Sequence, residues 1–149
     1  MLPKLAGVLS DDIAIDLGTA NTLVHVAGRG TIIDEPSMVA VRATGGERQI
    51  VAVGSEAQRI IGVAPEPLEA LYPLRDGVIA DFVATGVMLR EFIRRVRTAL
   101  RFRRPRILIS VPASATPVER RAVVDTAREA GARSVYLIAE PVAAMLGAG

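Results

Sequence analysis

An acidic residue and a short polar loop follow the first long apolar run of the sequence, and together they are suited to binding phosphate. Asp16 lies near the end of the run 13–17, and the loop after this run reads Gly18, Thr19, Ala20 and Asn21. Glycine lets the backbone approach a ligand closely, and consecutive backbone N–H groups form a nest for anions. A carboxylate beside the nest can hold Mg²⁺ through water. An ordinary hairpin turn is the alternative, since Asp, Gly and Asn are common in turns.

A second acid, Glu140, follows the apolar run 134–139 and precedes Pro141, which favours a helix start. If this run and the one containing Asp16 lie in the same sheet, the two carboxylates meet at one edge. Glu140 is then placed to orient or deprotonate an attacking water. The alternative is an acid that stabilises the first turn of a helix through the helix dipole.

The composition narrows the possible chemistry. The chain has 149 residues, enough for one ordinary domain, and half of them are hydrophobic although few are aromatic. An aliphatic core of this kind suits a sheet that is buried on both faces. The absence of Cys and the single His exclude disulfides, thiolate metal sites and multi-histidine sites. No apolar stretch is long enough to predict a membrane span.

The hydrophobic pattern predicts the elements that position the two acids. Strands are expected at 13–17, at 22–27, from Thr31 to Glu35-Pro36, at 106–111 and at 134–139. Helices are expected after Asp81 as N-cap to about Leu100, and from Pro117 to near Gly131 with Thr116 as N-cap and Glu119 as the acid of the first turn. A third helix is expected from Pro141 onward. The order predicts an α/β fold with a five-stranded mixed sheet and helices on both faces. Ligands of such sheets lie beyond the strand ends.

Residues 37–73 differ from the rest and are interpreted as a small inserted α+β subdomain. Two short strands flank a glycine turn, and a helix follows with Ser55 as its N-cap, Gln58 completing a capping box and Gly62 as its stop. Prolines mark a loop at 65–73. The main domain then comprises 11–36 and 74–149.

Two further segments allow more than one reading. In the amphipathic segment 1–10, Leu2, Leu5 and Leu9 share one helical face, which suits either a membrane surface or packing on the domain. The run 94–106 holds seven Arg. One Phe for base stacking and a near-balanced net charge favour a solvated or protein-contacting face over nucleic acid, so we expect no nucleic-acid partner.

Several segments resemble the MreB family of bacterial actin-like proteins. They are, in order, "IAIDLGTANTLVHVAGRGTIIDEPSMVAVR", "PLRDGVIADF", "ISVPASATPVERRAVVDTAREAGA" and "LIAEPVAAMLGAG", and they cover nearly the whole chain. The phosphate loop alone is shared by the actin, Hsp70 and sugar-kinase superfamily, whereas "EPS", "DGVIADF" and "ERRAV" together are narrower. The resemblance implies a ribonuclease H-like, actin-like ATPase domain.

The resemblance also implies a function. Proteins of this family bind ATP and Mg²⁺, form filaments at the cytoplasmic face of the inner membrane, and guide cell-wall synthesis together with membrane adaptor proteins. Asp16 matches the metal-associated acid, the loop 18–21 matches the phosphate loop, and Glu140 matches the acid that positions water. Ala139 stands where the family usually has a second Glu. The N-terminal leucines match a membrane-contacting segment.

The resemblance covers only the first of the family's two halves. The second phosphate loop and the adenosine pocket are absent, which leaves open whether the chain is an enzyme. We expect it to bind ATP weakly or not at all by itself and to hydrolyse none measurably. The alternatives are a non-enzymatic module that caps or regulates filaments, and a fragment of another superfamily ATPase such as a magnetosome filament protein. The reading frame beyond Gly149 distinguishes a module from half of a filament ATPase.

Overall fold

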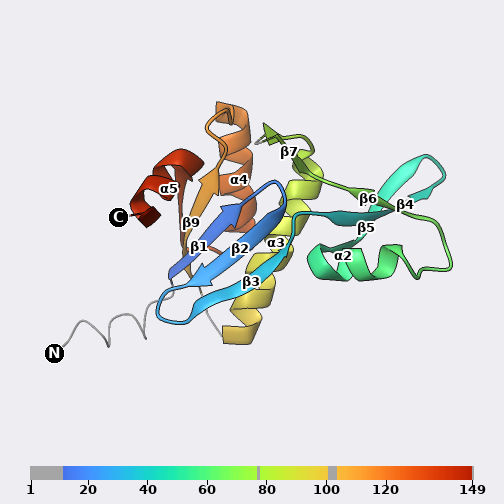
Figure 1. Cartoon of the computed structure of the whole chain (residues 1–149), viewed down its shortest axis with the longest axis horizontal. Helices are drawn as coiled ribbons and strands as arrows, with labels where there is room; N and C mark the ends of the chain where they lie inside the picture. The colour runs from blue at the N-terminus through green and yellow to red at the C-terminus, as the bar shows by residue number, and fades with distance from the viewer. Residues whose placement is uncertain (1–11, 77, 101–103, 149) are drawn as a thin grey trace.

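A five-stranded sheet forms the centre of the computed structural model, which describes residues 12–76, 78–100 and 104–148. The strand order is β10-β9-β1-β2-β3. The strands are β1 (Asp12–Leu17), β2 (Asn21–Val26), β3 (Gly30–Pro36), β9 (Arg106–Val111) and β10 (Ser134–Ala139). β1, β2 and β3 form the expected antiparallel meander, and β9 and β10 join it in parallel. The mixed sheet predicted from the sequence is therefore confirmed (Figure 1).

A second, smaller sheet projects to the right of the main one in Figure 1. It has the order β5-β4-β6, with β4 (Val39–Thr44), β5 (Glu47–Val53) and β6 (Leu68–Leu71), and it carries α2 (Gly54–Ile61). The strand β6 was not expected, because the prolines around it indicated a loop. The prediction of Ser55 as the N-cap was wrong: Val53 holds that position and makes no side-chain cap. Gly62 is the C-cap, as predicted.

Two helices of the main unit begin after the capping residues expected from the sequence, and the last begins at Glu140, one residue before the expected Pro141. They are α3 (Phe82–Leu100), α4 (Pro117–Glu129) and α5 (Glu140–Ala148), and α3 follows a short hairpin of β7 (Leu74–Arg75) and β8 (Val78–Ile79). Asp81 accepts a hydrogen bond from the backbone N–H of Ala84 at 2.8 Å. Thr116 and Glu119 form the reciprocal capping box, with Pro117 in the first turn.

The two faces of the main sheet are covered unequally. α3 and α4 pack on one face, where the core holds alternate residues of the strands such as Ile15, Val24 and Ile109. The other face carries α5 beside β9 and β10 and leaves Tyr136 and Leu108 exposed. α5 lies at the left of Figure 1, while α3 passes behind the sheet. Helices thus flank both faces, although one face remains open beside α5.

The first three arginines of the run 94–106 make contacts within the protein. Arg94 and Arg95 bind Glu91, and Arg97 donates to the carbonyl oxygen of Ala130 at 2.6 Å. These bonds agree with a solvated face that also packs against α4. Among the described residues, the structure contains no helix with the length and apolarity needed to cross a bilayer. The predicted amphipathic segment 1–10 lies outside the described residues.

Candidate phosphate and metal site

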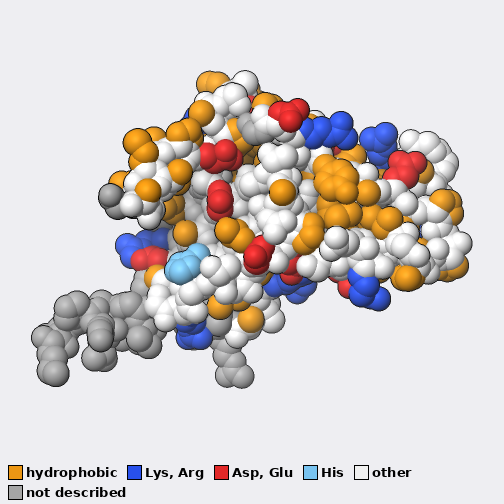
Figure 2. Space-filling view, viewed as in Figure 1, with side chains coloured by type: hydrophobic (Ala, Val, Ile, Leu, Met, Phe, Trp, Pro, Cys, Tyr) orange, Lys and Arg blue, Asp and Glu red, His pale blue; other side chains and the backbone are white. Residues whose placement is uncertain are grey.

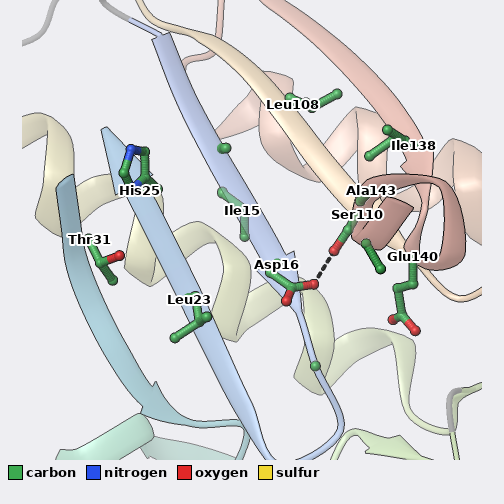
Figure 3. A pocket seen from close by; sticks show the side chains of 13 residues that line it. Ile15, Asp16, Leu23, His25, Thr31, Leu108, Ser110, Ile138, Glu140 and Ala143 are labelled. Carbon is green, nitrogen blue, oxygen red and sulfur yellow. Dashed lines mark hydrogen bonds between the residues drawn. The ribbon is translucent and has the colours of Figure 1, made fainter. Parts of the chain in front are cut away.

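Strand register brings the two predicted acids to the same edge of the sheet. Asp16 pairs with Ser110 of β9, and Ser110 pairs with Ile138 of β10, so that Glu140 starts α5 close to the end of β1. Both acids line one cavity of about 550 Å³, and Figure 3 shows their side chains at its edge. In Figure 2 acidic side chains lie along the hollow above the pale-blue histidine. His25 lines the same cavity and is exposed.

Ser110 orients the carboxylate of Asp16 and was not identified from the sequence. Its Oγ donates a hydrogen bond to Oδ1 of Asp16 (Figure 3) and accepts one from the backbone N–H of Leu17 at 3.3 Å. The Ser110 side chain is buried, with 5% of its surface exposed. In the sequence, Ser110 stands out only as a hydroxyl within an otherwise apolar strand. That pattern does not indicate that its partner is Asp16.

The loop after Asp16 is tight enough to require glycine at its start. A Cβ at Gly18 would lie 2.5 Å from the carbonyl oxygen of Asn21, a distance at which the backbone must shift. The side chain of Asn21 donates to Oδ1 of Asp34 at 2.8 Å and is therefore turned toward β3. Thr19 and Ala20 are exposed at the tip. The part of this loop suited to a phosphate is thus its backbone.

Glu140 has an environment that favours its protonated form. Partial burial and, second, the negative charge of Asp16 raise the pKa of Glu140 above its ordinary value of 4.5. A carboxylate with a raised pKa is a stronger base, which suits proton abstraction from water. Because this environment disfavours the ionised carboxylate, ionisation of Glu140 lowers the free energy of unfolding of the chain.

We predict that Glu140→Gln stabilises the chain slightly at pH 7. The folded state binds the proton more tightly than the unfolded state, so the stability that the carboxyl contributes below pH 4.5 is lost as the pH rises through the raised pKa. Urea unfolding of both proteins should show a gain at pH 7 that disappears near about pH 4. Glu69→Gln, at an exposed site on β6, is the control and should change little at either pH. An equal gain at both pH values would contradict the prediction.

The residues at the cavity fit a hydrated Mg²⁺ ion and a nucleotide phosphate tail. Mg²⁺ commonly keeps several waters and takes one or two carboxylates together with phosphate oxygens. Asp16 and Glu140 are the carboxylates among the described residues that line the cavity. The described part of the chain contains no group of three His, Asp or Glu residues able to hold a metal without phosphate. The cavity volume of about 550 Å³ lies within the usual range for small-molecule sites.

Comparison with protein families identifies a match over nearly the whole chain. The family model described as MreB/Mbl protein matches residues 10–149. The cell shape-determining protein MreB of Pasteurella multocida is 50% identical over 151 residues, which cover 99% of this chain and 43% of that protein. The corresponding Escherichia coli protein is 49% identical and is covered to 44%. The Mbl protein of Bacillus subtilis is 46% identical over 138 residues, which cover 93% of this chain and 41% of the Mbl protein.

Solved structures agree with the sequence comparison. The crystal structure of MreB5 of Spiroplasma citri bound to ADP has a TM-score of 0.74 and 34% identity, covering 93% of this chain and 40% of that one. A MamK double helical filament has a TM-score of 0.65 and 26% identity, covering 87% of this chain and 41% of that one. The chain thus spans less than half the length of the relatives it matches.

Proposed function

Since the chain belongs to the MreB/Mbl family, we propose that it provides the phosphate-binding and metal-associated part of a cell-shape-determining cytoskeletal ATPase. The observation that carries the proposal is the meeting of Asp16, Gly18 and Glu140 on one cavity, although Glu140 at the start of α5 is far along the chain from the end of β1. An ordinary hairpin turn has no reason to face a second acid across a cavity. The structural relatives support it: MreB5 was crystallised with ADP and with AMPPNP.

Each group of the site has a role in this proposal. The backbone N–H groups of the loop 18–21 bind phosphate oxygens, and Asp16, held by Ser110, accepts hydrogen bonds from water on the metal. Glu140 orients a water and takes its proton. Mg²⁺, when bound, neutralises charge on the phosphate oxygens. For the whole protein we further propose that it forms filaments at the inner face of the cell membrane. Its partners there are adaptor proteins of the membrane and proteins of cell-wall synthesis.

The proposal can be tested on the 149-residue chain by NMR. We expect addition of ATP with Mg²⁺ to shift the amide signals of Gly18 to Asn21, Asp16 and Glu140. The dissociation constant should be about 1 mM or weaker, because the chain spans less than half the length of its relatives. Asp16→Asn should remove the magnesium-dependent part of the response. Asp12→Asn, at the other end of β1, is the matched control and should leave the response unchanged.

Two results would contradict this expectation. If ATP with Mg²⁺ shifted signals far from the cavity and left the amides of the loop unchanged, the assignment of the phosphate site would be wrong. Micromolar binding by the chain alone would refute the expectation that a second half is needed for affinity.

Filament formation is tested in a chimera that has the full length of a relative. In this chimera the chain replaces the segment that it matches in the Escherichia coli relative, which is 49% identical to it. We expect the chimera to form filaments that depend on ATP and Mg²⁺ and to sediment with lipid vesicles. A folded chimera that hydrolyses ATP but does not polymerise would limit the proposal to nucleotide binding.

A further inference from the structure

Ser37 lies directly behind the phosphate loop, where the chain leaves β3 and enters β4. It is fully buried and is not among the residues that line the cavity, whereas Gly18 is. Its Oγ donates to the carbonyl oxygen of Gly18 at 2.6 Å, and its backbone N–H donates to the carbonyl oxygen of Ala20 at 2.8 Å. One residue therefore holds two carbonyl groups of a three-residue connection.

The planarity of the peptide bond turns these two contacts into a constraint on the loop amides. In a trans peptide the C=O and the following N–H point in opposite directions. With the Gly18 and Ala20 carbonyls turned toward Ser37, the N–H groups of Thr19 and Asn21 point away from it. Water cannot easily take over the role of Ser37, because its side chain has 0% exposure.

A second buried hydroxyl, that of Thr22, contacts Ser37. Thr22 Oγ1 lies 2.9 Å from Ser37 Oγ, and Thr22 is also fully buried. A hydroxyl has one proton to donate. Since Ser37 donates its proton to Gly18, Thr22 must donate to Ser37. The bond from Ser37 to Gly18 therefore does not depend on the Thr22 hydroxyl, which only donates to the oxygen of Ser37.

We propose that Ser37 is a positioning residue for the phosphate loop, holding the Gly18 and Ala20 carbonyls so that the Thr19 and Asn21 amides are presented to a phosphate group. The inference rests on the proposed function and deepens it. Because Ser37 also begins the segment that leads to the small sheet, the loop and that sheet are joined at one residue.

The test compares three variants of the chain by amide NMR, without ligand and with ATP and Mg²⁺. Ser37→Ala should shift the Thr19 and Asn21 amide signals in the free chain and weaken ATP binding about tenfold, the equivalent of one hydrogen bond at the upper end of the usual range. Thr22→Val also removes a buried hydroxyl, so it should destabilise the fold comparably while changing affinity by less than about threefold. Ser37→Thr keeps the donor and should restore most of the affinity. If Ser37→Ala does not fold, Ser37→Cys keeps the size with a weaker donor.

The outcomes separate this inference from the proposed function. Unchanged Thr19 and Asn21 signals in Ser37→Ala, or equal losses of affinity in Ser37→Ala and Thr22→Val, would overturn the inference while the phosphate site stands. If ATP with Mg²⁺ shifts signals of the unmodified chain far from the cavity and leaves the loop unchanged, the proposed function fails and the phosphate role of Ser37 fails with it. The spectra of the free chains then still decide whether Ser37 sets the loop conformation.

Discussion

Replacing Glu140 by Gln in the chimera is expected to lower ATP hydrolysis at least about 100-fold, because general base catalysis contributes 10²–10⁴-fold. Gln keeps the size and polarity of the side chain but cannot accept a proton from water. The dissociation constant of ATP should change by less than about threefold, because in the proposal Glu140 contacts water whereas the loop binds the phosphates. The measurement is phosphate release under saturating ATP, with the dissociation constant of ATP determined separately.

Two further variants make this prediction specific. Asp16→Asn should weaken magnesium-dependent binding as well as hydrolysis, because Asp16 holds the metal's water. Glu129→Gln, at the exposed end of α4, should alter neither. The position before Glu140 is Ala139, so no adjacent carboxylate can take over its role. If Glu140→Gln hydrolysed ATP at the unmodified rate, the assignment of Glu140 as the base would be wrong.

The parts of the structure that were predicted from the sequence are those governed by neighbouring residues. Asp81 and Thr116 cap helices through bonds that span three residues, and both caps are present. The alternation of apolar residues likewise identified the five central strands, because one or both faces of each strand are buried. The edge shared by Asp16 and Glu140 followed from the strand order, and its geometry is as expected.

The parts that could not be predicted depend on contacts between residues far apart in the chain. Ser110 meets Asp16 across 94 positions, and Ser37 meets Gly18 across 19. A serine in an apolar strand gives no sign of its partner. The same limit explains why the predicted N-cap of α2 was wrong. Glu35, 20 residues earlier, accepts a hydrogen bond from the backbone N–H of Ser55, so a local capping box is not needed. Assignment of the membrane-contacting leucines stays a prediction, because they lie outside the described residues.

Replacing Gly54 by Ala is expected to lower the free energy of unfolding of the chain by about 2.5–5 kcal/mol. Gly54 has φ +60°, and a Cβ there would lie 2.1 Å from Oε2 of Glu35 and 3.1 Å from Cζ of Phe92. The left-handed conformation costs a non-glycine residue about 1–2 kcal/mol. Displacing Glu35 adds about 1.5–3 kcal/mol for a lost hydrogen bond to a charged group. Urea unfolding measures the total.

A matched glycine separates backbone strain from the clash. Gly46 has φ +87° and nothing within 4 Å of its built Cβ. Gly46→Ala should therefore cost about 1–2 kcal/mol, which is the strain alone. If both variants lost the same free energy, the contact with Glu35 would contribute nothing and the prediction for Gly54 would be wrong.

The carboxylate of Glu35 explains why one methyl group at Gly54 has so large an effect. It accepts from the backbone N–H of Ser55 at 3.0 Å and from Nη1 of Arg95 at 3.1 Å, so it joins the start of α2 to α3 at the end of β3. If the new methyl acts by expelling this carboxylate, Glu35→Ala and Gly54→Ala should not be additive. The double variant should then be more stable than the sum predicts by about 1 kcal/mol or more, because the bonds of Glu35 can be lost once only. Strict additivity would place the cost of Gly54→Ala at Phe92 and in the backbone, because the methyl would then act without disturbing the bonds of Glu35.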